Sequence, residues 1–168
     1  LESLFPGRID LGLGRAPGGD MRTTRALRRL VGSAGDTFPD DLAELLAYFR
    51  PGGPGGGVHA IPGEGLTIPV WLLGSSDFSA RLAGRLGLPF SFAHHFSSAN
   101  TDLALELYRH EFRPSKWLAE PYAMVAVSAV CAETDERAEH LSMPAALSFL
   151  RLRQGRPGRM PSTEEAAN

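Results

Sequence analysis

Three short segments of this 168-residue sequence place chemically useful side chains directly after an apolar run. The first, residues 12–18, reads GLGRAPG. Gly14 would let a planar ligand approach the backbone, and the Arg15 guanidinium could hold a phosphate. A tight turn with a solvated arginine explains the same residues. The segment is no dinucleotide fingerprint, since Pro17 stands where the third glycine is needed, and no Walker A loop, since no Gly-Lys-Ser/Thr follows.

The second segment, residues 74–79, reads GSSDFS. A glycine at a strand end, followed by hydroxyl residues and a helix start, suits an anion. The free backbone N–H groups and the helix dipole favour a phosphate there, and Ser75, Ser76 and Ser79 add hydrogen-bond donors. The alternative is a helix-capping cluster, with Asp77 as the N-cap, because capping uses the same residue types.

The third segment contains two consecutive histidines, His94 and His95. Successive strand residues point to opposite faces, so at most one of the two faces a ligand. His95 lies nearer the strand end and is the candidate for acid–base catalysis, with a packed or exposed histidine as the structural alternative. No Asp or Glu lies nearby, which disfavours a metal site. The only cysteine, Cys131, is expected to be a small buried residue.

Each of these segments follows an apolar run that is typical of a strand. Each such run is then followed by residues with the spacing of an amphipathic helix. The expected strands cover residues 8–14, 70–73, 90–93 and 124–130, and the expected helices contain residues 42–49, 78–86, 103–108 and 134–141. Pro144 should break the last helix or start a second one. This alternation predicts parallel strands with right-handed crossovers. Periodicity leaves two architectures open, a doubly wound sheet and part of a (β/α)8 barrel, and both bind ligands at the carboxyl ends of the strands.

Composition restricts the class of protein. Lys and Arg total 17 and Asp and Glu 19, a net charge of −2 that argues against a nucleic-acid or anionic-membrane partner. The longest nearly apolar run, residues 122–132, is far short of the roughly 20 residues that span a bilayer. We expect no signal peptide and a cytoplasmic location. Residues 51–57 (PGGPGGG) predict a flexible loop, and residues 155–168 predict a polar, fraying tail.

Two of these segments, taken together, resemble a known family. Residues 5–18 (FPGRIDLGLGRAPG) resemble the middle of the bacterial-luciferase-like flavin monooxygenases. Residues 69–89 (PVWLLGSSDFSARLAGRLGLP) resemble the next unit of that family, and residues 122–141 are similar to a later one. The resemblance runs in order across nearly the whole chain. It implies a (β/α)8 TIM barrel, of which this chain supplies about four central-to-late strand–helix units.

The resemblance also implies roles for particular residues. Arg15 would reach the phosphate of FMN, and Gly14 would lie near the reactive edge of the flavin ring. Ser75, Ser76 and Ser79 would bind the phosphate. A (β/α)8 barrel takes about 250 residues, so we expect residues 1–168 to form a partial luciferase-like domain. We expect such an internal fragment to be neither stable nor active by itself.

The resemblance implies a reaction and its partners. Reduced, dissociable FMN and molecular oxygen would oxidise a small organic substrate, a separate flavin reductase would supply the reduced FMN, and a dimer is compatible with the family. A deazaflavin is the alternative cofactor. Two further alternatives stay open: a non-catalytic flavin-binding relative or subunit, and a phosphosugar- or nucleotide-binding enzyme with a doubly wound sheet.

Overall fold

The computed structural model describes residues 1–15 and 37–167. The chain divides into two compact units, Leu1–Val127 and Ser128–Asn168, which are described separately. The first unit contains β1 (Leu11–Gly14), α2 (Phe38–Tyr48), β2 (Val70–Gly74), α3 (Asp77–Leu86), β3 (Phe90–Ala93), α4 (Thr101–Glu111) and β4 (Ala123–Ala126). The second contains α5 (Asp135–Arg153) and α6 (Thr163–Ala167). Residues 16–18 of the first candidate segment (residues 12–18, GLGRAPG) lie outside the described residues.

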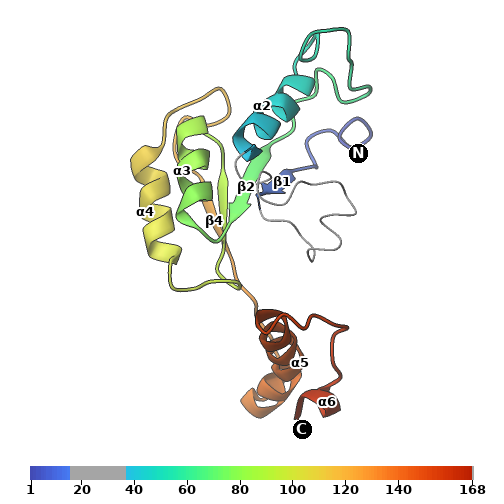
Figure 1. Ribbon diagram of the computed structural model, residues 1–168, viewed down its shortest axis with the longest axis vertical. Coiled ribbons are helices and arrows are strands. Elements are labelled where there is room, and N and C mark those ends of the chain that lie inside the picture. Colours follow the sequence, from blue (N-terminus) through green and yellow to red (C-terminus); the bar gives the residue numbers. More distant parts are fainter. Residues whose placement is uncertain (16–36, 168) are drawn as a thin grey trace. The chain divides into compact units, whose positions relative to one another are not determined.

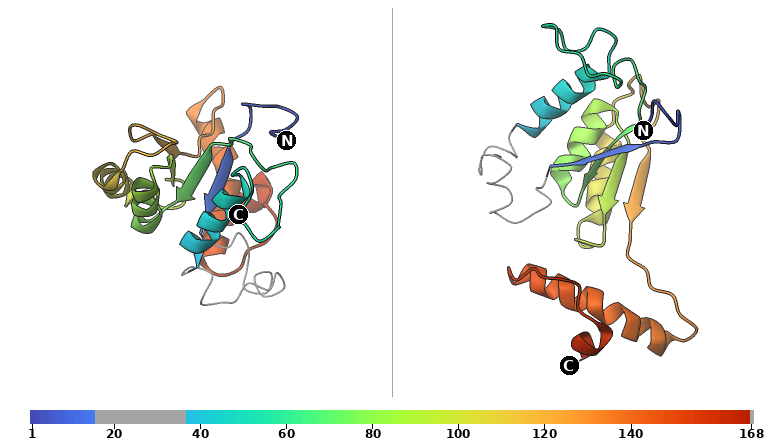
Figure 2. Two further views of the ribbon diagram at one scale, coloured as in Figure 1. Left: turned by 90° about the horizontal axis from the view of Figure 1, so that it is seen from above. Right: turned by 90° about the vertical axis from the view of Figure 1, so that its right-hand side faces the viewer.

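The four strands form one parallel sheet in the order β1-β2-β3-β4 (Figure 1). A doubly wound sheet reverses its strand order at a switch point and places helices on both faces. Here the spatial order follows the chain, and α2, α3 and α4 lie on one side of the sheet (Figure 2). This is the arrangement of successive units of a (β/α)8 barrel, as expected from the resemblance.

The helix-covered side of the sheet, called here the outer face, carries the core. Leu72 pairs with Phe90. Val70 and Phe92 lie two residues away from them along the same strands, so all four side chains share one face of the sheet. Residues of α2, α3 and α4 complete the cluster. Its buried members are Leu42, Val70, Leu72, Ala80, Ala83, Leu88, Phe90, Phe92, Ala104 and Tyr108.

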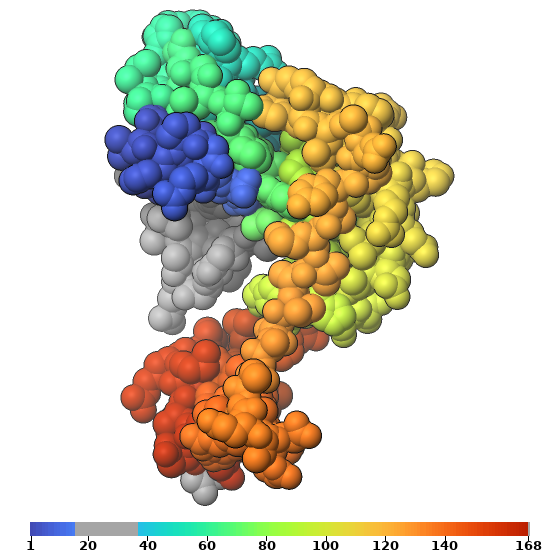
Figure 3. Space-filling model, turned by 180° about the vertical axis from the view of Figure 1, so that it is seen from behind, coloured from blue at the N-terminus to red at the C-terminus, as the bar shows by residue number. Residues whose placement is uncertain are grey.

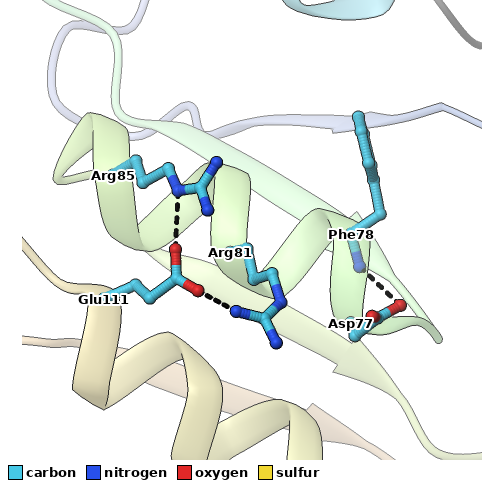
Figure 4. A network of polar contacts seen from close by, with 5 residues as sticks. All are labelled: Asp77, Phe78, Arg81, Arg85 and Glu111. Carbon is cyan, nitrogen blue, oxygen red and sulfur yellow. Dashed lines mark hydrogen bonds and ion pairs between the residues drawn. The ribbon is translucent and has the colours of Figure 1, made fainter.

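Helices α3 and α4 approach each other closely at Gly84. A Cβ at this position would lie 2.8 Å from the backbone oxygen of Tyr108, so a larger residue would push the helices apart. The carboxylate of Glu111 on α4 binds Arg81 and Arg85 on α3 (Figure 4). The hydrogen bond from Arg85 holds the pKa of Glu111 below its usual value. Partial burial of the carboxylate acts in the opposite direction, and the hydrogen bond from Arg81 lowers the pKa further.

The buried hydroxyl of Tyr108 fixes the approaches to two strands. It lies 3.0 Å from the carbonyl oxygen of Leu88, just before β3, and accepts the backbone N–H of Tyr122, just before β4, at 3.0 Å. Burial raises the pKa of Tyr108 above its usual value. One α4 side chain thereby fixes the spacing of β3 and β4, which present the opposite face to the site.

The opposite face of the sheet, called here the inner face, is far less covered. Its central row consists of Gly14, Leu73, Ser91 and Met124, which are successive partners across the four strands. Leu73 is 37% exposed and Met124 is 49% exposed. Figure 3 shows the residues of β4 at the surface of the first unit. The inner face is therefore accessible to a ligand or to further protein.

Several expected boundaries move. β1 begins at Leu11, where pairing with β2 begins, and β4 ends at Ala126 rather than at residue 130 because Ala93, its partner, is the last residue of β3. Asp77 is not the N-cap of α3: Ser76 takes that position, and Asp77 is the first helical residue.

The second unit corrects two expectations. The expected start of its long helix is confirmed, since the Thr134 hydroxyl accepts the N–H of Arg137. Pro144, however, neither breaks the helix nor starts another, because Leu141, Ala145 and their neighbours favour helix on both sides of the lost hydrogen bond. Cys131 is exposed rather than buried, since it follows β4 in an irregular segment that packs in no core.

The sequence predicts a flexible loop over residues 51–57 and a polar, fraying tail over residues 155–168. Residues 51–57 form a series of turns, tied at one end where the Glu64 carboxylate accepts the N–H of Gly52 and contacts His59. Within residues 155–168 the short helix α6 forms, and Arg151 of α5 binds Glu165 of α6. Among the residues described, no helix is both long and apolar enough to cross a bilayer.

Candidate functional site

A cavity of about 450 Å³ opens on the inner face, at the carboxyl ends of β1, β2 and β3. Its volume lies within the range of about 300–1,000 Å³ that is usual for small-molecule sites. Six residues predicted from the sequence line it together: Gly14, Arg15, Ser75, Ser76, Ser79 and His95. The segments that follow the first three strands therefore meet in one place.

Arg15 is held against the start of α3. Its guanidinium carbon lies 4.2 Å from the centre of the Phe78 ring, a stacking contact between cation and aromatic face. Figure 4 shows the Phe78 ring projecting from the first turn of α3, away from Glu111. The contact brings a fixed positive charge from the end of β1 to the second residue of α3. This is the convergence that a shared anion site requires.

The serines at this helix start are not used for capping. Ser76 has the extended backbone of an N-cap, yet its side chain makes no cap bond within the described chain. The Phe78 N–H instead binds the neighbouring Asp77 carboxylate at 2.9 Å. Ser79 is only 4% exposed, and no partner for its hydroxyl occurs among residues 1–15 and 37–167. These hydroxyls remain available to a ligand, which favours the anion-binding interpretation over the capping one.

Gly74 explains how Ser79 reaches its position. A Cβ built on Gly74 would collide with the Ser79 hydroxyl and lie 2.6 Å from the Ser79 Cβ. The strand can end directly beneath α3 only because this residue has no side chain. The glycine at the strand end thus makes room for a buried hydroxyl at the edge of the cavity.

The two histidines have different environments. The ring of His95 lines the cavity, and its Nδ1 lies 3.1 Å from the carbonyl oxygen of Ala126. A carbonyl oxygen only accepts, so Nδ1 carries the proton, and Nε2 of the neutral ring is left as an acceptor. His94 turns instead to Thr101, whose hydroxyl it contacts at 2.8 Å. His95 is thus the histidine that faces the cavity.

The predicted set omitted several lining residues, among them Ser91, and it omitted Phe78 beside the cavity. Ser91 lines the cavity from β3, and its position between the buried Phe90 and Phe92 was an available signal, because alternation puts it on the other face. Phe78 supports Arg15, and nothing in its spacing marked it, since an apolar residue in a first helical turn usually packs in the core.

The residues fit a planar ligand that carries a phosphate. Arg15 supplies a positive charge, and the helix start supplies the serine hydroxyls that line the cavity. Gly14 leaves its strand end open: a Cβ there would make only ordinary contacts, the nearest at 3.5 Å to the Leu73 carbonyl oxygen. The cavity thus combines an end whose residues suit an anion with a strand end that carries no side chain.

Comparison with known proteins agrees with this geometry. The family model for luciferase-like monooxygenases matches residues 1–167. The chain is 59% identical over 167 residues to the uncharacterized protein YvbT of Bacillus subtilis (strain 168), covering 98% of this chain and 49% of that protein. It is 50% identical over 161 residues to a luciferase-like monooxygenase of Escherichia coli (strain K12), covering 96% of this chain and 48% of the relative.

A solved structure shows the same fold. The crystal structure of apo-MsnO8 superposes with a TM-score of 0.84 at 33% identity, covering 99% of this chain and 49% of that one. The chain thus spans about half the length of the curated relatives it matches. Sequence, fold and cavity agree, and the chain belongs to the luciferase-like monooxygenase family.

Proposed function

We propose that this chain contributes the phosphate-binding part of the site of a flavin-dependent monooxygenase, which uses reduced FMN and molecular oxygen to oxidise a small organic substrate. The observation that carries the proposal is the meeting of Arg15, Ser75, Ser76 and Ser79 in one cavity. Membership of the family supports the reaction type.

Each residue has a role that its position supports. Arg15 and the serine hydroxyls hold the phosphate through charge-assisted hydrogen bonds. Gly14 lets the flavin ring lie against the end of β1. Bound reduced flavin supplies the electrons that oxygen chemistry needs. The residues that line the cavity would orient the ring.

His95 is the candidate for proton transfer. Its Nδ1–H is directed to Ala126, so a neutral His95 presents Nε2 as a proton acceptor. Replacing His95 by Gln should reduce turnover and change its pH dependence while leaving FMN affinity nearly unchanged. Turnover that stays at the wild-type level across the pH range would assign His95 a structural role only.

The binding test is a titration of the full-length protein with FMN. Removing the guanidinium in Arg15→Ala should weaken FMN binding by roughly 1.5–3 kcal/mol, the worth of a hydrogen bond to a charged group. Arg8→Ala is the matched control, since Arg8 also lies over a phenylalanine ring, that of Phe5, but does not line the cavity. Equal FMN affinity of the Arg15 variant and the wild type would overturn the proposed phosphate site.

Two alternatives are separated by further arms of the same experiment. A non-catalytic flavin-binding relative would bind FMN but consume no oxygen beyond the background of free reduced FMN when organic substrates are added. A deazaflavin-dependent relative would bind the deazaflavin more tightly than FMN. Substrate-dependent oxygen consumption with reduced FMN supports the monooxygenase.

A further inference from the structure

The two consecutive histidines that follow β3 have side chains that point to different parts of the molecule. His95 lines the cavity, whereas the half-buried His94 turns toward Thr101, the first residue of α4. One peptide bond joins the two histidines, so a contact that fixes the ring of His94 also restricts the backbone that carries His95. The candidate for proton transfer therefore has a neighbour that is anchored outside the cavity.

The hydrogen bonds of His94 form a chain with a fixed direction. The Thr101 hydroxyl donates its single hydrogen to the carbonyl oxygen of Ser98 at 3.0 Å. It can therefore only accept at its 2.8 Å contact with His94, which means that Nδ1 of His94 carries the proton. The backbone N–H of Thr101 binds the same Ser98 oxygen at 3.3 Å. This chain ties the residue that follows β3 to the first turn of α4.

A second set of hydrogen bonds holds His95 from β4. Its backbone N–H and its ring Nδ1 lie 3.3 and 3.1 Å from one carbonyl oxygen, that of Ala126 at the end of β4. One acceptor thus serves two donors, and the ring is exposed to water, which competes for the same bonds. How well the ring is held therefore depends on where the turn that contains both histidines lies.

We propose that His94 is a positioning residue for His95. Its hydrogen bond to Thr101 anchors the turn after β3 to α4, and thereby keeps the His95 ring in the cavity with Nδ1 protonated. Without this bond, backbone hydrogen bonds would hold the turn, among them the bond from the Phe96 N–H to Ala93 at 3.0 Å. The inference deepens the proposed function, because the importance of a fixed His95 rests on its role in proton transfer.

The direct test is the tautomer of His95 in the full-length protein, observed by NMR with isotope-labelled histidine. Spectra are recorded about two units above the usual histidine pKa of about 6.5, and the signal that His95→Gln removes identifies His95. The wild type should show the proton on Nδ1. His94→Ala and Thr101→Val should each give a mixture of the two tautomers, whereas Thr101→Ser retains the hydroxyl and should keep the wild-type signal. His110→Ala is the matched control, since this exposed histidine of α4 does not line the cavity.

A second measurement links the position of the ring to the chemistry. The probe is reduced FMN, and its oxidation by dissolved oxygen on the full-length protein is followed in a single turnover. His94→Ala should slow this oxidation about three- to tenfold, the value of one neutral hydrogen bond, while FMN affinity is unchanged. In the His95→Gln background the same change should have no further effect, because a positioning residue acts only through the group that it positions. An equal further loss in that background would show that His94 acts on the fold and not through His95.

The outcomes separate the positioning role from the proposed function. If the protein binds FMN but His94→Ala changes neither the His95 tautomer nor the rate, the positioning role is wrong and the proposed function stands. An unchanged rate in His95→Gln, or a change of tautomer without a change of rate, would overturn the link to proton transfer. If the wild-type protein does not bind FMN, the proposed function fails, and the tautomer in His94→Ala alone then supports or overturns the positioning of His95.

Discussion

Leu72 and Leu73 are adjacent in β2, but they lie in opposite environments. Leu72 faces α2, α3 and α4 and is 1% exposed, whereas Leu73 faces the cavity and is 37% exposed. The outer face consists almost entirely of apolar side chains in contact with helices. The inner face combines apolar residues with glycines and a buried serine. In this strand, residues of the core and residues that line the cavity therefore alternate with a period of two.

The contrast shows which face of the sheet is covered by other residues of this chain. The outer face has its covering helices within the first unit. The inner face leaves Leu73, Met124 and other apolar groups open to solvent. In a (β/α)8 barrel such side chains form packed layers with residues from across the axis. We therefore propose that the inner face acquires its cover from barrel units outside this chain.

The largest effect concerns the 168-residue chain by itself. Burying an apolar side chain contributes about 1.5–3 kcal/mol, so a few uncovered inner-face residues match a typical net stability of about 5–15 kcal/mol. Among the described residues β1 and β4 are also the outermost strands of the sheet, and strands at a sheet edge can pair with other chains. Gel filtration and a thermal melt should show association or a broad transition. A sharp melt of a monomer that FMN stabilises would contradict the proposal.

The adjacent leucines allow the two faces to be separated by mutation. In the full-length protein, Leu72→Ala should lower the free energy of unfolding by about 2–5 kcal/mol, because it leaves a cavity in the core. The folded variant should retain its FMN affinity. Leu73→Ala should instead weaken FMN binding and cost less stability, because Leu73 faces the cavity rather than the helix-covered core. Urea unfolding and FMN titration measure the two effects, and equal stability losses would show that the faces do not differ as described.

A smaller effect is expected from the aromatic support of Arg15. Phe78→Leu removes the stacking but preserves an apolar side chain, so FMN affinity should fall by about 0.5–1 kcal/mol while riboflavin affinity is unchanged. The matched control is Phe149→Leu in the second unit, where Arg153 lies over the ring outside the cavity. If the variant loses as much riboflavin affinity as FMN affinity, the role of Phe78 is to shape the cavity and not to support Arg15.

The smallest expected effect is the pH dependence of stability that the Glu111 contacts between α3 and α4 produce. The pKa of Glu111 is lowered in the folded protein, chiefly by Arg85, so the carboxylate stabilises the fold above its unfolded pKa of about 4.3. That contribution is lost as pH falls through the lower, folded pKa. Melting temperatures of the wild type and Glu111→Gln should therefore differ at neutral pH and converge in acid. Glu106→Gln, an exposed neighbour on α4, should show no such difference.

The sequence predicted the helix–strand alternation well where local pattern and tertiary contacts agree. Phe90–Ala93 forms the strand that was expected, since its alternation and its neighbours favour the same structure. The end of β4 could not be read from the three valines of residues 124–130, because a strand ends where its partner ends. Pro144 was misleading because it predicts a break in the helix, whereas a long helix tolerates one missing hydrogen bond.

The sequence identified residues that line the cavity but not the contacts that hold them in place. Arg15, Ser76 and His95 were identifiable because polar residues at the carboxyl ends of parallel strands meet at one edge. The stacking of Arg15 on Phe78 and the exposure of Cys131 depend on which segments lie side by side, which a single sequence does not reveal.

The most direct test of the account compares the affinities of the wild-type, full-length protein for FMN and riboflavin. If Arg15 and the serines at the start of α3 bind a phosphate, FMN should bind at least about tenfold more tightly than riboflavin, the value of one hydrogen bond to a charged group. Raising the salt concentration should reduce this ratio, because part of it is electrostatic. Equal affinities for the two flavins would contradict the phosphate site on which the proposed function depends.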